Sequence, residues 1–279
     1  MDAISGTTKV LGLIGRPVAH SASPAIHNTF ASKLGLDTAY VVFDVAPADL
    51  ETAIAGAYAL GISGLNVTYP HKARAADLAI TLDELATQAA AVNTLKLTPG
   101  GYVGYNTDVI GVENALVARG IMPNFATIVG AGAAATAAAI ALARLGTSHL
   151  TITNRTNKNA KTLASRLKMY YNVDITVCEA HDSGILEHSS DICVFATAFD
   201  APNPLSLKGN FGAVLNMNYH GNSLSSPYDS DNNTATFISG IEVLVHQAAA
   251  AYEIFCNGEI IIPQGVVNDI IDALSSDRR

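Results

Sequence analysis

Two serines near the N-terminus have the type and spacing needed to hold one small anion. Ser21 and Ser23 are two residues apart, so in an extended backbone both hydroxyls would point to the same side and could donate to one carboxylate. Ser23 also has a structural explanation, because a serine directly before Pro24 is the expected N-cap of a helix that begins with proline. That explanation is weaker for Ser21.

Amides, a lysine and an aspartate follow in three further segments. Asn66 and Thr68 lie on one face of a predicted strand, and Lys72 comes just after that strand. Asn93 and Asp108 belong to the other two segments. A lysine is usually a solvated surface charge, and the helix dipole alone favours an aspartate at the start of a helix. Together, the four segments predict a site for a small polyhydroxylated acid beside a nicotinamide.

A glycine loop is the strongest motif that carries a mechanism. The run Gly130–Ala135 reads Gly-Ala-Gly-Ala-Ala-Ala, and it follows a predicted strand and opens a predicted helix, as a dinucleotide fingerprint requires. The first glycine permits a tight turn, and the second lets the backbone approach a pyrophosphate. The helix N-terminus then supplies unpaired N–H groups to phosphates. The same residues could serve plain helix packing, but their context favours a nucleotide site.

The end of the next strand indicates which nucleotide is bound. An NAD site should carry an Asp or Glu there for the ribose 2′-hydroxyl, but the chain has Asn154, Arg155 and Thr156. Arg155 offers a planar, permanent positive charge with several donors, which suits a phosphate. The same three residues could form a turn with Thr156 as a helix cap, and capping and phosphate binding can coexist. The motif therefore predicts NADP rather than NAD.

Apolar strand-like runs alternate with helical patterns along the chain, which predicts an α/β fold with parallel strands. The most economical division has a substrate-binding and catalytic domain at residues 1–106 and a Rossmann-type, doubly wound dinucleotide domain at residues 107–240. Helices in residues 241–279 could pack on either domain. Residues 94–105 predict a hairpin, and the polar residues 221–233 predict an exposed loop.

The composition argues against several other classes of protein. Of 279 residues, 49% are hydrophobic and 14% are charged, against roughly 25% charged in a typical soluble protein, and the formal net charge is −8. No basic stripe is present, which disfavours nucleic-acid binding. The longest near-apolar stretch, Ala131–Leu145, is interrupted by Arg144 and is shorter than the ~20 residues of a membrane span.

The N-terminus lacks the basic and apolar regions of a signal peptide. Three scattered cysteines, Cys178, Cys193 and Cys256, form neither a disulfide framework nor a zinc pattern, and no pair of histidines has zinc-ligand spacing. We therefore expect a cytoplasmic protein without a bound metal, which acts on a small molecule and not on a nucleic acid or a membrane. The choice between monomer and homodimer stays open.

In order along nearly the whole chain, these motifs resemble those of the shikimate dehydrogenase family. The resemblance implies that the C-terminal helices return to the first domain, and that the activity is a reversible NADP-linked reduction of 3-dehydroshikimate to shikimate. The segments that carry it are Gly15–Pro17, His20–Pro24 with His27 and Asn28, Asn66–Thr68 with Pro70 and Lys72, Ala91–Thr94, Asn106–Asp108, the glycine loop, Asn154–Thr156 and Gly240–Ala248.

The resemblance also implies roles at the matching positions. Protonated Lys72 would stabilise the growing alkoxide and assist proton transfer to the carbonyl oxygen, and Asp108 would orient Lys72 and hold it charged. Ser21 and Ser23 would hold the substrate carboxylate. The other substrate contacts would be Asn66, Thr68, Asn93, Asp108, Tyr219 and Gln247. The cofactor contacts would be Gly130, Ala131, Gly132, Ala133, Ala134, Asn154, Arg155, Thr156, Thr197 and Gly240.

Three positions depart from the family's pattern. Phe195 replaces the Asn of an Asn-Ala-Thr stretch, Asn216 replaces an Asp, and Glu242 replaces a Gly near the start of the final helix. All three lie in the second half of the chain. They affect the expected geometry of the bound cofactor and the reaction rate more than the expected class of substrate. They therefore predict a divergent paralogue.

Two other interpretations stay open. A quinate/shikimate dehydrogenase with relaxed substrate or cofactor use is one, although Ser23 mildly favours shikimate. A non-catalytic sensor that binds shikimate or a nucleotide is the other, although a sensor has no need to keep both Lys72 and Asp108.

Overall fold

The computed structural model describes residues 4–179, 185–187, 189–197, 206–208, 210–218 and 235–276. The chain forms two compact units, one from Met1–Thr107 with Val245–Arg279 and the other from Asp108–Leu244. The sequence places the corresponding limits at residues 106 and 240. Both boundaries between the units fall inside helices, namely α5 (Thr107–Ala118) and α8 (Gly240–Phe255).

The first unit is built on a mixed sheet of six strands in the order β2-β1-β3-β5-β6-β4. β1 is parallel to β2 and β3, β5 is antiparallel to β3 and β6, and β4 is parallel to β6. The predicted hairpin is confirmed as β5 and β6. The strands are β1 (Lys9–Gly15), β2 (Thr38–Asp44), β3 (Gly64–Val67), β4 (Thr81–Leu82), β5 (Thr94–Thr98) and β6 (Gly101–Tyr105).

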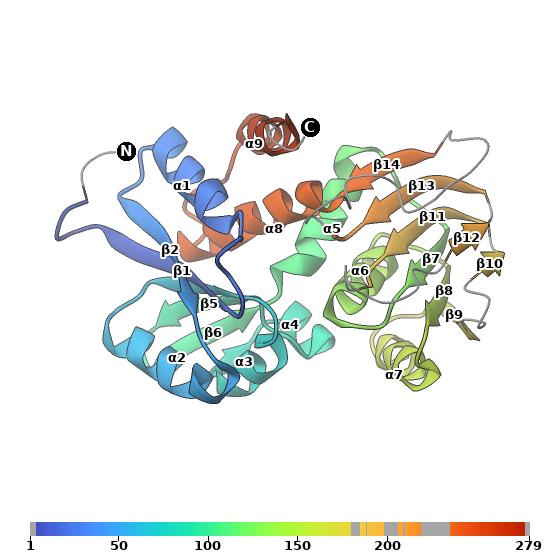
Figure 1. The fold of residues 1–279 in the computed structure, drawn as a ribbon, viewed down its shortest axis with the longest axis horizontal. Helices are drawn as coiled ribbons and strands as arrows, with labels where there is room; N and C mark the ends of the chain where they lie inside the picture. The colour runs from blue at the N-terminus through green and yellow to red at the C-terminus, as the bar shows by residue number, and fades with distance from the viewer. Residues whose placement is uncertain are drawn as a thin grey trace. The chain divides into compact units, whose positions relative to one another are not determined.

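Helices cover both faces of this sheet. Figure 1 shows α1 and α8 on one side and α2 and α3 on the other. On the first side an aromatic cluster joins α1, β2 and α8, and on the second a core forms around Leu50, Ile54 and Leu65. The remaining elements of the unit are α1 (Ser23–Leu34), a 3₁₀ turn η1 (Pro47–Asp49), α2 (Leu50–Ala59), α3 (Lys72–Leu78), α4 (Glu84–Ala89) and α9 (Gln264–Ser276).

The start of α1 corrects one expectation. The N-cap is Ala22, with helical dihedral angles, and it makes no side-chain capping bond, whereas Ser23 is already the first residue of the helix. The expectation that Ser23 caps the helix is therefore wrong. The sequence rule failed because the helix begins one residue earlier than the proline indicates.

The second unit contains a parallel sheet of six strands in the order β14-β13-β11-β7-β8-β9. Counted along this unit, the order is that of the doubly wound dinucleotide fold, with the switch point between β7 and β11. The predicted Rossmann-type architecture is confirmed. The strands are β7 (Phe125–Val129), β8 (His149–Asn154), β9 (Asp174–Glu179), β11 (Ser190–Phe195), β13 (Phe211–Asn216) and β14 (Thr236–Ser239), and a separate parallel pair is formed by β10 (Ile185–Glu187) and β12 (Ser206–Lys208).

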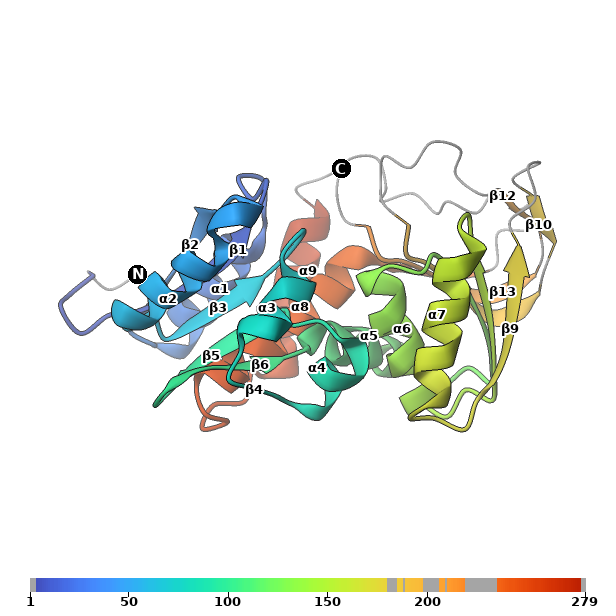
Figure 2. The same cartoon turned by 90° about the horizontal axis from the view of Figure 1, so that it is seen from below.

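Two helices follow the first strands of this sheet, α6 (Ala133–Arg144) after β7 and α7 (Asn157–Lys168) after β8. Figure 2 shows them side by side, and they contact each other and the sheet. Seven residues of α6 are buried, five of them alanines, so small side chains allow close packing of helix against sheet. This packing accounts for part of the low charge content.

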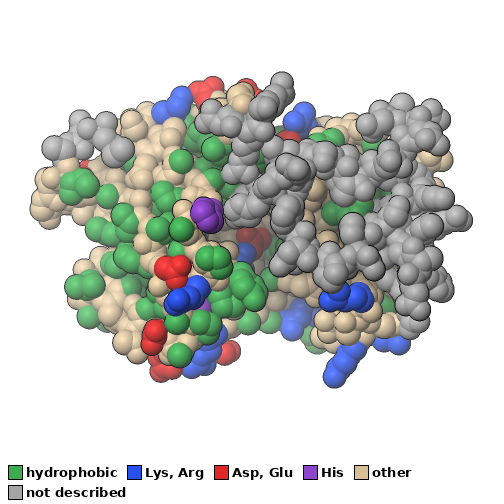
Figure 3. All heavy atoms as spheres, in the orientation of Figure 1, with side chains coloured by type: hydrophobic (Ala, Val, Ile, Leu, Met, Phe, Trp, Pro, Cys, Tyr) green, Lys and Arg blue, Asp and Glu red, His purple; other side chains and the backbone are tan. Residues whose placement is uncertain are grey.

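On the face seen in Figure 3, Lys and Arg gather over α7, and a second group that mixes Asp, Glu, Lys and Arg lies on the first unit. In the described part of the chain, no helix is both long and apolar enough to cross a bilayer. The predicted exposed loop at 221–233 lies outside the described residues.

Candidate active site

The β5–β6 hairpin brings three of the four predicted polar segments of the first unit together. Antiparallel pairing places Thr94 opposite Asn66 on β3 and opposite Tyr105 on β6. Asn93 therefore comes just before the start of one strand, and Thr107 just after the end of the other. Residues far apart in the chain meet at these strand ends, because the hairpin returns the chain from the end of β6 to the point where β5 begins.

Asn66 is held at both ends of its amide. Tyr40 Oη donates to Asn66 Oδ1 at 2.8 Å. Asn66 Nδ2 donates to Thr94 Oγ1 at 3.0 Å and to the backbone oxygen of Asn93 at 3.2 Å. These bonds fix the amide plane, since its oxygen end and its nitrogen end are both anchored.

Asn93 continues the same set of hydrogen bonds. Its Nδ2 donates to Thr107 Oγ1 at 2.9 Å and to Gln247 Oε1 at 3.2 Å. Its Oδ1 accepts from the backbone N–H of Thr107 at 2.7 Å and from Thr94 Oγ1 at 3.1 Å. Asn93 therefore connects the two ends of the hairpin to α8.

We call this set the strand-end network. Its members are side chains from β2, β3, β5 and the residue before it, the start of α5 and α8, and each is at most 8% exposed. Sequence reasoning named half of them as contacts and included both threonines in its motifs without a role. It missed Tyr40, because a tyrosine in a strand is an ordinary core residue. The members are Tyr40, Asn66, Asn93, Thr94, Thr107 and Gln247.

A buried histidine lies directly behind Tyr40. The rings of His27 and Tyr40 are stacked, with centroids 4.1 Å apart and planes at 5°. His27 is 1% exposed, and neither of its ring nitrogens has a hydrogen-bond partner. Burial lowers the pKa of His27 to about 3. His27 is therefore neutral at physiological pH and acts as an aromatic packing group.

The two serine hydroxyls that are predicted to hold a carboxylate lie next to each other at the start of α1. Ser21 Oγ and Ser23 Oγ are 3.1 Å apart, and Ser21 Oγ also accepts from the N–H of Ser23 at 3.2 Å. The two hydroxyls approach because Ala22 between them has helical dihedral angles, and not because the backbone is extended. They lie at the positive end of the α1 dipole, which favours an anion.

Lys72 opens α3 directly after the turn that follows β3. Its backbone oxygen accepts from the N–H of Val92 at 2.9 Å, which ties the start of α3 to the segment before Asn93. Thr68 comes one residue after the end of β3, and its N–H donates to the oxygen of Ile14 at 2.9 Å. The main chain around the predicted catalytic lysine is thus anchored at both sides.

Asp108 lies in the first turn of α5, as its helix-start interpretation predicts. It directly follows Thr107, whose side chain and N–H both belong to the strand-end network. The backbone of Asp108 is therefore held in place by its fully buried neighbour, Thr107.

The glycine loop of the second unit fits a dinucleotide. Gly130 has φ +125°, and a Cβ there would lie 2.5 Å from the backbone oxygen of Ala196, so only glycine is tolerated. Gly132 is the N-cap of α6, and a Cβ on it would have no described heavy atom within 4 Å. Protein packing explains the first glycine but not the second. Space beside Gly132 and the first turn of α6 is what a pyrophosphate requires.

The second cofactor segment follows β8. Arg155 is exposed and forms no ion pair with any residue that the structure describes. Asn154 Nδ2 donates to the backbone oxygen of Thr156 at 3.0 Å. Thr156 occupies the N-cap position of α7 but makes no side-chain capping bond. The Thr156 hydroxyl therefore does not serve as a helix cap, and the Arg155 guanidinium is not paired with a described carboxylate.

The remaining cofactor and substrate predictions fall at the ends of β11, β13 and β14. Thr197 follows β11, and its backbone oxygen accepts from Asn218 Nδ2 at 3.0 Å. A Cβ on Gly240 would lie within 3 Å of three consecutive backbone oxygens, from Asn216 to Asn218, so close packing accounts for this glycine. Tyr219 lies outside the described residues.

The three departures from the family's pattern have partners in the second unit. Phe195 is buried in a core with Val129 and Phe211. Asn216 Oδ1 accepts from the N–H of Asn218 at 3.1 Å.

Glu242 is buried at the start of α8 and binds two groups. Arg119 Nε donates to its Oε2 at 2.9 Å, and the N–H of Ser239 donates to its Oε1 at 3.1 Å. The second bond is half of a capping box, whose sequence signature is Ser239-Gly-Ile-Glu242. That signature was available in the sequence and was missed. The carboxylate therefore stabilises the start of α8.

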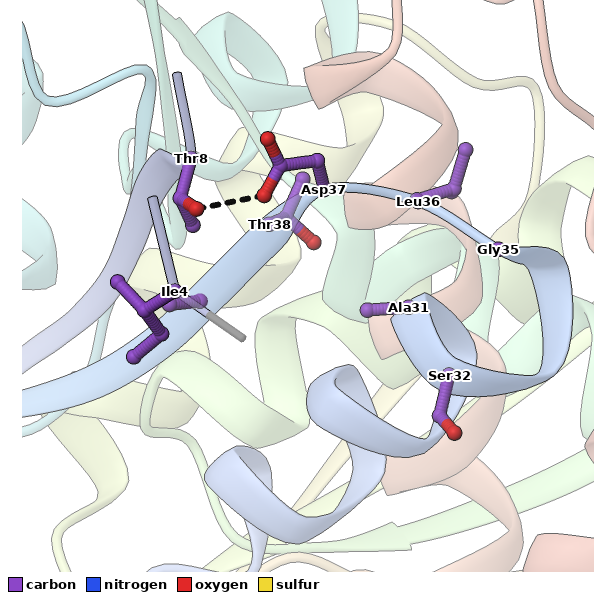
Figure 4. Close-up of a pocket in the computed structure, with 9 residues that line it drawn as sticks. Ile4, Thr8, Ala31, Ser32, Gly35, Leu36, Asp37 and Thr38 are labelled. Carbon is purple, nitrogen blue, oxygen red and sulfur yellow. Dashed lines mark hydrogen bonds between the residues drawn. The ribbon is translucent and has the colours of Figure 1, made fainter. Parts of the chain in front are cut away.

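A cavity of about 110 Å³ lies at the C-terminal end of α1 and the start of β2, away from the strand-end network (Figure 4). Asp37 lies on its wall and accepts from Thr8 Oγ1 at 2.6 Å and Thr7 Oγ1 at 2.9 Å. These hydroxyls lower the pKa of Asp37. None of the predicted site residues lines this cavity, so it is separate from the candidate site.

Two family models match the chain. Residues 13–95 match the shikimate dehydrogenase substrate binding domain, and residues 117–223 match shikimate / quinate 5-dehydrogenase. The NADP(+)-dependent shikimate dehydrogenase of Anaeromyxobacter dehalogenans (strain 2CP-C) is 37% identical over 259 residues, which cover 90% of this chain and 92% of that protein.

Solved structures agree with these matches. A shikimate dehydrogenase in complex with NADP+ has a TM-score of 0.79 and 31% identity, with 97% of each chain covered. The shikimate 5-dehydrogenase of Listeria monocytogenes, in complex with shikimate and NAD, has a TM-score of 0.82 and 25% identity, with 97% of this chain and 99% of that chain covered.

Proposed function

Because this chain belongs to the shikimate dehydrogenase family, we propose that it catalyses the reversible NADP-dependent reduction of 3-dehydroshikimate to shikimate. One observation carries the proposal beyond the family match. The polar segments Asn66–Thr68, Ala91–Thr94 and Asn106–Asp108 converge on one buried hydrogen-bond network at the strand ends of the first unit.

The cofactor proposal rests on the second unit. The parallel sheet has dinucleotide-fold order, Gly130 is sterically required, and Gly132 opens α6 beside open space. The first turn of α6 would hold the pyrophosphate, and Arg155 with Thr156 would hold the 2′-phosphate of NADP. When bound, NADPH supplies the hydride that reduces the substrate's carbonyl carbon.

The chain's own chemical task is to handle the proton on the substrate's oxygen. In the proposed mechanism, protonated Lys72 Nζ donates to the oxygen that gains negative charge during reduction, and it accepts the proton back in the reverse direction. Asp108 orients Lys72 and favours its charged form. A positioned general acid contributes roughly 10²–10⁴-fold to the rate.

The proposed substrate contacts divide by chemistry. Ser21 and Ser23 hold the carboxylate with two hydroxyl donors at the positive end of α1. Ring hydroxyls are bound by Asn66, Thr68, Asn93, Asp108, Tyr219 and Gln247. The amides among them can both donate and accept, which suits hydroxyl groups.

A single assay tests this function. Purified protein is mixed with shikimate or quinate and with NADP or NAD, and the absorbance of the reduced nicotinamide is followed. We expect the highest kcat/KM for shikimate with NADP. A higher value for quinate would identify a quinate/shikimate dehydrogenase, and calorimetric binding without turnover in any combination would identify a sensor.

We also propose that the enzyme acts in the cytoplasm on small molecules, as a monomer or homodimer. The three cysteines are free thiols in the structure, which suits a reducing compartment. Light scattering after size-exclusion chromatography distinguishes the two assemblies, and a mass above that of a dimer would contradict both.

A further inference from the structure

The strand-end network contains a buried tyrosine that the proposed mechanism does not use. Tyr40 is 3% exposed on β2, and its hydroxyl donates to Asn66 Oδ1 at 2.8 Å. Asn66 is one of the proposed contacts to a ring hydroxyl. The inference drawn from this bond therefore rests on the proposed function.

The geometry around Asn66 shows what the tyrosine contributes. Both hydrogens of Asn66 Nδ2 are directed to protein acceptors, Thr94 Oγ1 and the Asn93 backbone oxygen. Those two bonds anchor the nitrogen end of the amide, whereas Tyr40 anchors its oxygen end. An amide oxygen has two lone pairs, so Oδ1 can accept from Tyr40 and still accept from a ligand hydroxyl.

Tyr40 is itself held rigidly. Its ring stacks on His27 at a centroid distance of 4.1 Å, and His27 also contacts Phe30, Tyr252 and Phe255. Such close packing restricts the ring to one rotamer. A rigid donor holds its acceptor in place better than a mobile donor, because less conformational entropy is lost when the ligand binds.

We propose that Tyr40 is a positioning residue for the substrate, which acts through Asn66 by fixing the plane of its amide and the direction of the remaining lone pair on Oδ1. His27 supports this role by stacking on the ring of Tyr40. Neither residue needs to touch the substrate. The ligand class that benefits is a small molecule with a hydroxyl group that donates to Asn66.

The test is the Tyr40→Phe variant, which keeps the ring and its stacking and removes only the hydroxyl. Since one buried hydrogen bond is lost, we expect the KM for shikimate to rise about two- to tenfold, with kcat and the KM for NADP within about twofold of wild type. The matched control is Tyr102→Phe. Tyr102 is 2% exposed in the same sheet, and its hydroxyl donates to the backbone oxygen of Ile62 at 2.7 Å, outside the network.

A double-mutant cycle separates positioning from general destabilisation. If Tyr40 acts through Asn66, adding Tyr40→Phe to Asn66→Ala leaves the KM for shikimate where Asn66→Ala alone puts it. Additive increases in KM would overturn the proposal, as would an equal increase in Tyr102→Phe. An unchanged KM in Tyr40→Phe would overturn it as well.

A second variant keeps the proposal testable if Tyr40→Phe does not fold. Thr94→Val keeps the shape of the side chain and removes the hydroxyl that accepts from Asn66 Nδ2 and donates to Asn93 Oδ1. It therefore loosens the Asn66 amide from its other end and also removes one bond to Asn93. We expect a similar rise in the KM for shikimate, and an unchanged KM would contradict the role. Absence of wild-type turnover would overturn the proposed function, whereas normal wild-type turnover with no change in these variants would overturn the positioning role alone.

Discussion

In the first unit several predicted site residues are side chains bonded to one another or to a shared network, whereas in the second they are a glycine-rich loop and a few polar side chains, among them one exposed cation. Asn66, Asn93 and Gln247 share a buried network with three neighbours that the sequence did not single out. Gly130 and Gly132 matter because they have no Cβ atom, and the exposed Arg155 follows the end of β8.

The difference shows that the two sites are held rigid in different ways, the first by hydrogen bonds between side chains and the second by backbone conformation. A network of amides and hydroxyls has one satisfied arrangement, and removing one partner leaves a buried polar group at a cost of about 1–3 kcal/mol. A glycine loop relies on backbone conformation and open space, so its changes are steric and local. Substitutions in the first unit should thus affect stability together with substrate binding, whereas those at Gly132 and Arg155 should affect the cofactor alone.

The largest expected effect is at Lys72. Lys72→Ala should lower kcat by about 10²–10⁴-fold and change the KM for shikimate little, because a general acid acts mainly in the transition state. Steady-state kinetics measure both constants. Lys33→Ala, which removes a surface lysine paired with Asp269, is the control and should leave kcat unchanged. A larger change in KM than in kcat would make Lys72 mainly a binding residue.

The next effect tests the exposed cation of the second unit. Arg155→Ala should weaken NADP binding about 10- to 100-fold and NAD binding much less, because charge-assisted hydrogen bonds to the 2′-phosphate are lost. Calorimetric titration with each cofactor measures this difference. Lys168→Ala removes the same charge from the last residue of α7 and should discriminate little between cofactors. Equal weakening of NADP and NAD in Arg155→Ala would refute the phosphate assignment.

The third effect concerns the aromatic side of the first unit. Burial lowers the folded-state pKa of His27 from 6.5 to about 3, so between these values only the unfolded chain binds the proton. The stability that neutral His27 contributes is complete above pH 6.5 and is lost as the pH falls. Between pH 7.5 and pH 5 this loss amounts to about 2 kcal/mol.

Urea unfolding of wild type and His27→Phe at both pH values measures this contribution. The variant should lose less stability on acidification, since phenylalanine takes no proton in the unfolded state. The carboxylates contribute equally to the pH dependence of stability in the two proteins, so they cancel in the comparison. No charged side chain is among the described rings that surround His27. Equal losses in the two proteins would show that His27 is not held neutral by burial. The rings around His27 are those of Phe30, Tyr40, Tyr252 and Phe255.

The smallest effect distinguishes the two glycines. Gly132→Ala should lower the free energy of unfolding by no more than about 1 kcal/mol, because the new Cβ meets no described atom within 4 Å and only the preference for glycine over alanine at the N-cap is lost. It should weaken NADP binding about tenfold by occupying space beside the pyrophosphate. Thermal unfolding and calorimetric titration check the two parts. Gly130→Ala is the contrast and should destabilise the fold, and unaltered NADP affinity in Gly132→Ala would place the cofactor elsewhere.

Much of the fold was predictable because its signals are local. The strand and helix periods, the β5–β6 turn and the glycine loop each depend on residues within about one element of each other. The site was predictable in part. Asn66, Asn93 and Gln247 were named as contacts from motifs, and Thr107 lies inside a motif without having been assigned a role. Tyr40 was not named at all, because nothing in its immediate sequence distinguishes it from a core residue.

The sequence by itself determined the α/β class, the dinucleotide loop, the absence of an acidic residue at the end of β8 and the family. Only the tertiary structure decided the hydrogen-bond partners. Asn93 meets Gln247 across 154 residues, Asn66 meets Tyr40 across 26, and Glu242 meets Arg119 across 123. The physical reason is that a buried polar group takes whatever partner the packed elements bring within about 3 Å, and chain separation does not encode that distance.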